Sequence, residues 1–404
     1  MHLPRKTYRL FSNVAQFCVT HQLIEPGRPI VAGISGGVDS VMLLAFLHWY
    51  AEQVNFPFVV CHVNHMIRGE EADQDEVLVR AYCHERAIPF ESVKAPVTDM
   101  AREIGRGIEE TGRIVRRAAF LNIGRRYFEK NTLLTSDSVK SEEFPSLKIS
   151  EGDVHRAAKE GTITDMTTTF DVALGHHMND RAESILMHIG RGSGIAGLVG
   201  IRPRDGRFVR PFLNVRLEEL VDSAQELDVV WREDATNESS DYLRNRIRHF
   251  LMPIWHDVLG YDPVPRLVSL GDLAAEDEKT LTQFANNALI DARLSDQSLS
   301  ISAVCALPKG LALRVIRLFF EEETKLVDDE DLAHEEDDYE FFMSSIPMKD
   351  NKTFSANHAV SLLDLIYRVD TGEMIEGALN LPGNVTAYAK NGRFFLVREK
   401  KNVT

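Results

Sequence analysis

SGGVDS, residues 35–40, lies between the apolar segments PIVAGI (residues 29–34) and VMLLAFLHWY (residues 41–50). The first segment is typical of a strand buried on both faces, and the second is typical of a buried helix. Gly36 and Gly37 allow a tight turn and a close approach of the backbone to an anion, and a helix start supplies unpaired N–H groups. We therefore interpret SGGVDS as a phosphate-binding turn. The alternative is a plain strand-to-helix turn with a serine cap.

Strands and helices alternate along the chain beyond this turn. Residues 58–63 (FVVCHV) and 171–175 (DVALG) predict further strands, whereas residues 73–86 and 182–189 predict helices. This order predicts an α/β fold, a Rossmann-like parallel sheet with helices on both faces. Such sheets bind ligands at the carboxyl ends of their strands. The sequence contains no GxxxxGK[ST] motif, so a Walker-type phosphate loop is excluded.

The length of 404 residues predicts two or three domains. Residues 1–218 carry the alternating pattern and form the expected first domain, which residues 131–169 interrupt as a polar insertion with weak periodicity. Residues 219–404 are predicted to be mainly helical, notably over residues 267–294 and 311–320, and to end in a small β-containing segment. In that segment Pro-Gly-Asn and Lys-Asn-Gly punctuate two short alternating strands.

The net charge of −15 is concentrated in one segment. Residues 321–340 contribute −11, from twelve acidic residues and one Lys, and predict a linker or a solvated face. Arginine-rich stretches at residues 102–126, 202–216 and 244–248 provide local positive charge. The acidic balance of the chain therefore does not exclude a nucleic-acid partner.

The composition predicts a cytoplasmic protein. No segment approaches the roughly 20 apolar residues of a membrane helix, and the N-terminus has no apolar signal segment. The four cysteines are widely spaced and include no CxxC pair, which predicts reduced, buried thiols rather than a disulfide or zinc framework.

Further motifs accompany SGGVDS, in order, between residues 30 and 255. They are HVNH (62–65), RGEE (68–71), GHHMND (175–180), RGSG (191–194), RPF (210–212), EDATN (233–237) and RNRIR (244–248). Together these motifs resemble the tRNA(Ile)-lysidine synthetase family of the N-type ATP pyrophosphatases, which belong to the PP-loop superfamily. The resemblance implies an ATP-dependent ligase. Such an enzyme joins free L-lysine to C2 of the wobble cytidine of tRNA(Ile) with a CAU anticodon, through an adenylated cytidine intermediate.

The resemblance also implies a set of site residues. ATP would contact Ser35, Gly36, Gly37, Val38, Asp39, Ser40, Asn64 and His65. Asp39, Arg113, His176 and Asp180 would be catalytic, with Mg²⁺ held by Asp39 and Asp180, and RNA would be bound by Arg116, Arg191, Arg244, Asn245 and Arg248. Asp39 suits a metal role on chemical grounds, because Mg²⁺ is bound by carboxylate oxygens next to phosphates.

Each of these clusters has a structural alternative. His176 and Asp180 lie four residues apart at a strand-to-helix junction and can share one helix face, but a helix-capping His beside a solvated Asp gives the same spacing. Arg113 and Arg116 can be exposed charge on a helix. Arg117 departs from the family, in which an aromatic residue is usual at this position.

The arginines at residues 244–248 suit phosphate or anticodon-loop contacts. Their alternative is an ion-pair cluster with Glu233, Asp234 and Asp241. The C-terminal third resembles the tRNA-binding domain of the family, so we expect residues 219–404 to bind tRNA.

Two other functions stay open. A tRNA thiolase of the same superfamily usually needs paired cysteines, which this chain lacks. A non-catalytic RNA-binding scaffold could retain the same fold. The partners that the resemblance implies are tRNA(Ile), free lysine, ATP and Mg²⁺, and a homodimer is left open.

Overall fold

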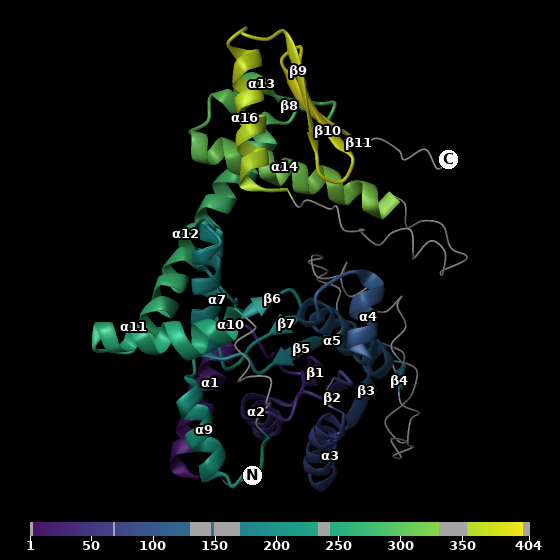
Figure 1. Ribbon diagram of the computed structural model, residues 1–404, viewed down its shortest axis with the longest axis vertical. Coiled ribbons are helices and arrows are strands. Elements are labelled where there is room, and N and C mark those ends of the chain that lie inside the picture. The colour runs from purple at the N-terminus through teal and green to yellow at the C-terminus, as the bar shows by residue number, and fades with distance from the viewer. Residues whose placement is uncertain are drawn as a thin grey trace. The chain divides into compact units, whose positions relative to one another are not determined.

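The structure is a computed structural model that describes residues 3–67, 69–129, 147–148, 170–232, 243–330 and 354–398. It divides into two compact units, Met1–Ala274 and Ala275–Thr404, whose helices and strands are drawn in Figure 1. Each unit has its own hydrophobic core. Most of the expected insertion and the second half of the acidic segment lie outside the described residues. In the part that is described, no helix is both long and apolar enough to cross a membrane.

Among the described residues of the first unit, seven strands form one sheet in the order β4-β3-β2-β1-β5-β7-β6. Neighbouring strands run parallel, except that β6 is antiparallel to β7. The strands are β1 (Ile30–Gly33), β2 (Phe58–Asn64), β3 (Phe90–Lys94), β4 (Leu147–Lys148), β5 (Asp171–Leu174), β6 (Arg204–Asp205) and β7 (Phe208–Val209). The predicted α/β fold is confirmed, and β3, β4, β6 and β7 add strands that the apolar pattern does not reveal.

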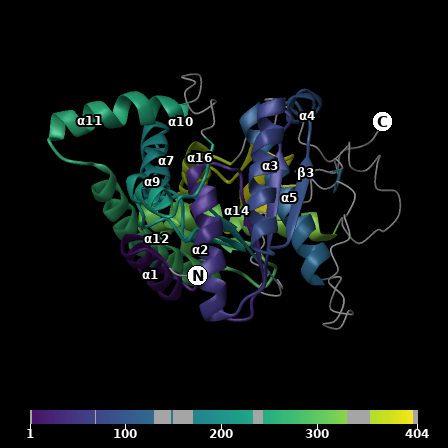
Figure 2. The same cartoon turned by 90° about the horizontal axis from the view of Figure 1, so that it is seen from below.

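The central strands are buried on both faces, as their continuous apolar runs predict. Ile30 and Ala32 of β1 belong to the same core cluster as Phe11, whereas Val31 belongs to another cluster with Phe120. The first face is covered by α1 (Arg5–Thr20), α2 (Val38–Val54), α3 (Glu70–Glu85) and α9 (Leu217–Glu226), and the second by α5 (Ile108–Gly124), against which α4 (Val97–Ile104) packs. α1 and α9 lie side by side (Figures 1 and 2).

β1 is the strand at which the order of the sheet reverses. The chain runs from β1 to β2 and β3 on one side and then places β5 on the other side, where Gly33 pairs with Leu174. Ligands of open parallel sheets bind at such a reversal, beyond the carboxyl ends of the strands. Because SGGVDS follows β1 and GHHMND follows β5, the two motifs leave the sheet next to each other.

The first unit continues past residue 218, the expected domain boundary. It includes α7 (Met178–Gly190), α8 (Ile195–Leu198), α10 (Leu243–Arg246), the π-helix η5 (Ile247–Leu251), α11 (Met252–Leu259) and the first part of α12 (Val264–Ala292). Ala182 and Ile185 of α7 pack against Val264 and Leu267 of α12. These apolar contacts, rather than the alternation of strands and helices along the sequence, determine which helices belong to the first unit.

The second unit combines helices with a small antiparallel sheet, as predicted. Among its described residues the strand order is β8-β11-β10-β9. The elements are α13 (Ile301–Cys305), α14 (Lys309–Glu330), α16 (Ala356–Asp370), β8 (Leu299–Ser300), β9 (Glu376–Leu381), β10 (Val385–Lys390) and β11 (Arg393–Arg398). β9 is missing from the sequence prediction because it is a mostly exposed edge strand with a weak apolar pattern, in which Leu381 is buried and Leu379 is half-buried. α14 extends to Glu330, so the first half of the acidic segment is helical rather than a linker.

Candidate active site

The SGGVDS turn is closed by the hydroxyl group of Ser40. Its Oγ accepts hydrogen bonds from the N–H groups of Ser35 (3.1 Å) and Gly36 (3.0 Å) and donates one to the carbonyl of Gly37 (2.9 Å). Gly36 has a φ of +103°, a conformation that favours glycine. α2 begins at Val38 without a side-chain cap, and the N–H of Ser40 donates to the carbonyl of Gly37 (3.1 Å), so the N–H groups of Val38 and Asp39 are the ones available to an anion.

Two residues that the sequence analysis missed hold this turn in place. The N–H of Arg232 donates to the carbonyl of Gly36 (3.1 Å), and its Nε donates to Oδ1 of Asp75 (2.7 Å). Asp75, on α3, is buried and lies so close that a Cβ on Gly36 would stand 3.4 Å from the Cβ of Asp75. No local sequence signal marks these contacts, because they depend on the packing of distant segments.

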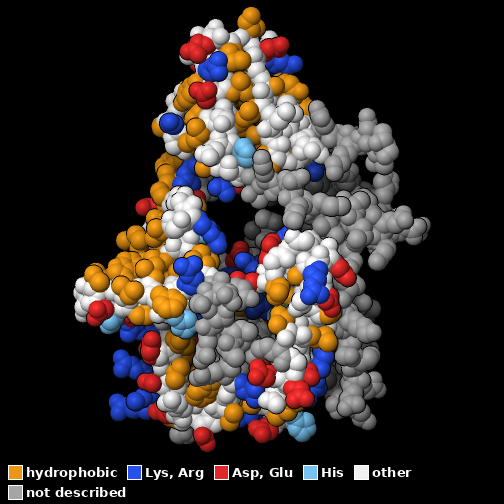
Figure 3. Space-filling view, in the orientation of Figure 1, with side chains coloured by type: hydrophobic (Ala, Val, Ile, Leu, Met, Phe, Trp, Pro, Cys, Tyr) orange, Lys and Arg blue, Asp and Glu red, His pale blue; other side chains and the backbone are white. Residues whose placement is uncertain are grey.

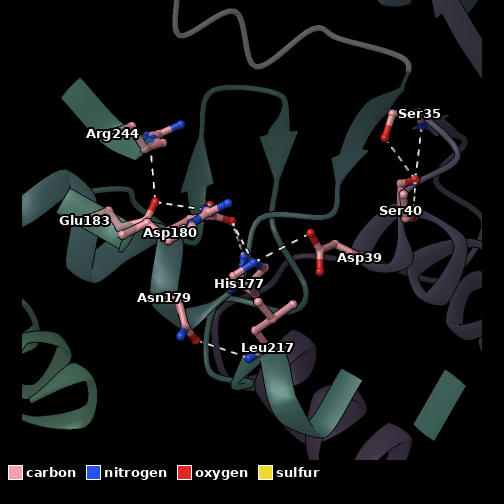
Figure 4. A network of polar contacts seen from close by, with 11 residues as sticks. Ser35, Asp39, Ser40, His177, Asn179, Asp180, Glu183, Leu217 and Arg244 are labelled. Atoms are coloured by element: carbon pink, nitrogen blue, oxygen red, sulfur yellow. Dashed lines mark hydrogen bonds and ion pairs between the residues drawn. The ribbon is translucent and has the colours of Figure 1, made fainter. Parts of the chain in front are cut away.

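His177 joins the two motifs through their carboxylates (Figure 4). Its Nε2 lies 3.6 Å from Oδ2 of Asp39 on α2 and 3.4 Å from Oδ2 of Asp180 on α7. Oδ2 of Asp180 also accepts the backbone N–H of His177 (3.0 Å). The structure therefore brings Asp39 and Asp180 together, but through a histidine that the sequence analysis did not select. The adjacent histidines of GHHMND give no local signal as to which one turns toward Asp39.

The two carboxyl groups differ in their pKa. Burial raises the pKa of Asp39 to about 6, and the nearby Asp180 adds to this rise, against the opposing effects of His177 and Arg248. Burial also acts to raise the pKa of Asp180, but its two neighbouring histidines and Arg248 outweigh burial and hold that pKa below its usual range. Oδ1 of Asp39 is buried and has no hydrogen-bond partner among the described residues, so it is available to a cation.

His176, the expected catalytic histidine, lies among arginines. Burial lowers its pKa to about 3, and Arg210, Arg244 and Arg116 lower it further, against the opposing effect of Asp180. The imidazole is therefore neutral at pH 7. Its Nδ1 is buried and has no hydrogen-bond partner within the described ranges.

Arg244 and Arg248 pair with acidic residues of α7. Arg248 donates from Nε to Oε1 of Glu183 (2.6 Å) and from Nη2 to Oδ1 of Asp180 (3.2 Å). Nε of Arg244 lies 3.6 Å from Oε2 of the same Glu183 (Figure 4). Glu183 is buried, so two arginines from α10 and η5 balance one buried carboxylate.

This pairing favours the ion-pair interpretation of the RNRIR motif over the RNA-binding one. The acidic partners suggested by the sequence, at residues 233, 234 and 241, lie outside the described residues. Asn245 is buried, whereas Arg246 is exposed. RNA binding by Arg244, Asn245 and Arg248 stays a prediction.

A family model of the PP-loop domain matches residues 7–138 and 162–255. The chain belongs to the PP-loop family. One similar relative is the tRNA(Ile)-lysidine synthase of Geobacillus kaustophilus, which is 31% identical over 320 residues that cover 76% of this chain and 59% of that protein. Another is the tRNA(Ile)-lysidine synthase of Chlorobaculum tepidum, 31% identical over 258 residues that cover 64% of this chain and 66% of that protein. The chain spans less than two thirds of the length of these relatives.

Solved structures show a weaker likeness. The U34-tRNA thiolase from Methanococcus maripaludis gives a TM-score of 0.46 and 15% identity, with 67% of this chain and 80% of that chain covered. The NH3-dependent NAD synthetase from Campylobacter jejuni gives a TM-score of 0.33 and 10% identity, with 69% and 94% covered. At these scores neither likeness bears on the function.

Some of the expected residues do not project into the space beside the PP-loop. Arg191 is exposed at the far end of α7, whose 13 residues extend about 20 Å. Asn64 ends β2, and its Nδ2 donates to Oδ1 of Asp73 (2.9 Å) while its Oδ1 accepts the N–H of Met66 (2.9 Å). Asn64 thus shapes the turn that contains His65, and nucleotide contacts by these two residues stay a prediction.

α5 carries Arg113 and Arg116 toward the PP-loop site. Arg116 is close enough to His176 to lower its pKa, and the pKa of Arg116 is itself lowered by desolvation, by Arg113 and by Arg244. Neither Arg113 nor Arg116 forms an ion pair with a described residue. Both guanidinium groups are therefore available to phosphate oxygens.

Asp39 and Asp180 suit a magnesium ion that is bound together with ATP. Mg²⁺ is commonly held by one or two carboxylates with substrate phosphates and water. The unpartnered Oδ1 of Asp39 and the ionised Asp180 provide such donors. Within the described ranges, no group of three or more His, Cys, Asp or Glu side chains could hold a metal ion, so phosphate oxygens would have to complete the coordination.

Proposed function

We propose that the chain is an ATP-dependent ligase that joins L-lysine to C2 of the wobble cytidine of tRNA(Ile) with a CAU anticodon, giving lysidine. The observation that carries this proposal is the position of His177 between Asp39 of the PP-loop and Asp180. Because arginines surround the adjacent His176, one centre offers donors for phosphates and carboxylates for cations. Relatives named tRNA(Ile)-lysidine synthase, at 31% identity, support the choice of substrate.

The first step activates the cytosine. Its C2 carbonyl oxygen attacks the α-phosphorus of ATP, a new O–P bond forms, and the bond to the β-phosphate breaks so that pyrophosphate leaves. The N–H groups of Val38 and Asp39 at the start of α2 would hold the pyrophosphate, and Arg113 and Arg116 would stabilise charge on the α-phosphate. Mg²⁺, bound by Asp39 and Asp180, would supply further positive charge to the phosphates.

The second step joins the lysine. Its neutral ε-amine attacks C2, the bond from C2 to oxygen breaks, AMP leaves with that oxygen, and the amine proton passes to solvent. A cavity of about 190 Å³ beside α7 is lined by Glu183, Arg248 and Asp262, among other residues. We place the lysine in this cavity, because carboxylates and a guanidinium together suit an amino acid that carries both ammonium and carboxylate groups.

Lysine incorporation tests the proposal directly. Purified protein is incubated with ATP, labelled L-lysine and a tRNA(Ile) transcript with a CAU anticodon, and a transcript with U at the wobble position is the control. We expect ATP-dependent incorporation into the first transcript alone, with one AMP released per lysine. ATP cleavage without lysine incorporation would contradict the ligase assignment. Glu183→Gln should raise the KM for lysine more than the KM for ATP, which tests the cavity separately.

The two alternative functions gain no support from the described residues. Burial raises the pKa of Cys83 to about 12 and that of Cys305 to about 11, and it also raises the pKa of Cys18 and Cys61. Protonated thiols are poor sulfur carriers, which weakens the thiolase alternative. A scaffold without catalysis does not need the raised pKa of Asp39, a feature typical of active sites. Sulfur transfer to the same tRNA is the result that would favour a thiolase.

The proposed partners are tRNA(Ile), free lysine and ATP, and a cytoplasmic location stays a prediction. A homodimer has a candidate surface on η5 and α11. None of the side chains of α11 is buried, and Phe250, Ile254 and Val258 are 57%, 62% and 75% exposed. Apolar side chains gather over this helix, at the left of the space-filling view (Figure 3). Sedimentation of the purified protein over a range of concentrations tests whether copies associate.

A further inference from the structure

Three arginines lie together beside β7. Arg113 and Arg117 are one helical turn apart on α5, and Arg210 directly follows β7. The guanidinium of Arg117 lies over the ring of Phe208 in β7, 4.2 Å from the ring centroid. The three guanidinium groups are close enough to interact, because Arg113 and Arg117 both lower the pKa of Arg210.

The charge of this arginine cluster is weakly balanced. Arg210 is 7% exposed, donates to the carbonyl of Arg202 (2.8 Å), and has its ion-pair partner Asp205 at 4.0 Å. The Nε atoms of Arg210 and Arg117 are buried and have no hydrogen-bond partner among the described residues. In the same part of the chain, Arg113 and Arg117 form no ion pair within 4 Å. Three positive charges therefore face one carboxylate at the limit of ion-pair distance.

Of the three, only Arg210 is buried, whereas Arg117 is half-buried and Arg113 is exposed. A buried charge is unfavourable unless an opposite charge is present, and like charges beside it add to the cost. Burial lowers the pKa of Arg210 to about 10, and desolvation lowers that of Arg117, although Asp205 opposes both effects. Guanidinium groups bind phosphate oxygens through paired N–H donors, and these bonds are strong where water is excluded. A bound phosphate would supply the missing charge and also acceptors for the two buried Nε atoms.

The cluster is separate from the PP-loop. Val209 pairs with Ala173 of β5, and β5 pairs with β1, so Arg210 lies two strands away from the start of the PP-loop. Neighbouring strands are about 4.8 Å apart, which puts about 10 Å between the two sites. Arg210 nevertheless lies close to His176, whose pKa it lowers. A phosphate bound there would belong to a group other than the pyrophosphate at the PP-loop.

We propose that Arg117 and Arg210, which lie beside Arg113 of the proposed catalytic centre, form a subsite for one phosphodiester of the RNA strand next to the reacting cytidine. This inference rests on the proposed function and adds Arg117 and Arg210 to the residues that position the RNA. A strand that presents one base at the carboxyl edge of β1 and β5 carries its adjoining phosphates along the same sheet edge. A phosphodiester supplies the negative charge that the arginine cluster lacks.

Arg117→Gln tests the subsite, because Arg117 is partly exposed and its loss reduces the repulsion on Arg210. The affinity for an anticodon stem-loop RNA is measured over a range of salt concentrations, without lysine. We expect roughly tenfold weaker binding and a log–log salt slope reduced by about 0.7 to 0.9, with the affinity for ATP unchanged. Arg117→Lys should keep the slope. Arg102→Gln, which removes an exposed arginine paired with Asp99, is the matched control and should change neither quantity.

The position of the phosphate is tested with RNAs in which one phosphate beside the wobble cytidine is replaced by a neutral methylphosphonate. One of these RNAs should bind the wild-type protein more weakly than the unmodified RNA does. The Arg117→Gln variant should bind that RNA and the unmodified RNA with equal affinity. This loss of sensitivity identifies the phosphate that Arg117 contacts.

Two results would overturn the subsite. One is an equal salt slope for the wild type and Arg117→Gln. The other is a loss of ATP affinity in Arg117→Gln with unchanged RNA binding, which would assign the cluster to a nucleotide phosphate. A different result would contradict the proposed function itself. In that case the wild-type protein would bind the CAU stem-loop no better than a stem-loop with another anticodon.

Discussion

The Nε2 atom of His177 lies 3.6 Å from Oδ2 of Asp39, and this contact joins the turn after β1 to the turn after β5. The approach of the two segments depends on Gly175. A Cβ at that position would stand 3.0 Å from the carbonyl oxygen of Asp39 and 3.2 Å from the nitrogen of Ser40. These are backbone atoms, which cannot move aside as a flexible side chain can. The absence of a side chain at Gly175 therefore allows the site to form.

Gly175→Ala should separate the two motifs and weaken ATP binding. The added methyl group meets backbone, so we expect the free energy of unfolding to fall by about 1–3 kcal/mol and ATP affinity to fall roughly tenfold. Gly190→Ala is the matched control, because a Cβ at Gly190 meets nothing within 4 Å. Urea denaturation and ATP titration of both variants check the expectation. If Gly175→Ala keeps the stability and the ATP affinity of the wild type, the close approach of residue 175 to the backbone of Asp39 is not needed for the site.

Asp39→Ala should abolish ligation and leave the fold intact. The side chain is 36% exposed and its Oδ1 has no hydrogen-bond partner among the described residues, so its removal breaks few contacts. Loss of a charge that organises the cation and the phosphates should lower kcat by at least about a hundredfold. Single-turnover adenylation measures the chemistry, and circular dichroism measures the fold. Near-normal turnover with ATP and Mg²⁺ would exclude the assigned role.

The raised pKa of Asp39 predicts a pH-dependent difference between the wild type and Asp39→Asn. The carboxyl group has a pKa of about 6 in the folded chain, against an ordinary value of 3.8, so folding favours its protonated form. Its contribution to stability is present below the ordinary value and is lost as pH rises through 6. Asp39→Asn should therefore have the higher Tm at pH 7.5, and the gap should shrink as pH falls from 7 to 4.

Thermal melts at constant ionic strength measure this gap. Asp99→Asn changes an exposed aspartate and is the control, for which no comparable trend is expected. A Tm difference that does not vary with pH would mean that Asp39 does not have the raised pKa.

The parts of the fold that could be predicted have local signals. The apolar runs of β1 and β2 mark strands buried on both faces, and the glycines of SGGVDS mark the turn between strand and helix. β7 has two residues, Phe208 and Val209, and exists because they pair with β5. Pairing with a distant strand leaves no pattern in so short a segment. The first unit extends to Ala274, beyond the expected boundary, because α7 packs against α12, and contacts between distant helices likewise leave no local pattern.

The candidate site could be predicted as a position but not as a set of contacts. Asp39 and Asp180 each follow a strand of the sheet, so their place at one edge was accessible from sequence. The choice of His177 over His176 as the link between them depends on how β5 leads into α7. Glu183 is an ordinary helix residue by sequence, and only the packing of α10 and η5 against α7 identifies it as the partner of two arginines.

Arg244 and Arg248 are expected to contact RNA from the sequence, but in the structure they pair with Glu183 and Asp180. Breaking these pairs leaves the buried Glu183 without either arginine, while Asp180 keeps its contacts with His177. The double substitution Arg244→Ala and Arg248→Ala should therefore lower the free energy of unfolding by about 3 kcal/mol. Because Arg248 already donates to both carboxylates and Arg244 lies 3.6 Å from Glu183, we expect the salt slope of tRNA binding to stay at its wild-type value.

Urea denaturation measures the stability of this double variant, and tRNA binding over a range of salt concentrations measures the slope. Arg246→Ala is the matched control, since Arg246 lies between the two arginines and is exposed. It should keep the stability of the wild type. Each phosphate contact that is lost lowers the log–log slope by about 0.7 to 0.9. A double variant with wild-type stability and a slope lowered by about 1.5 would show that both arginines leave their carboxylates to bind RNA phosphates.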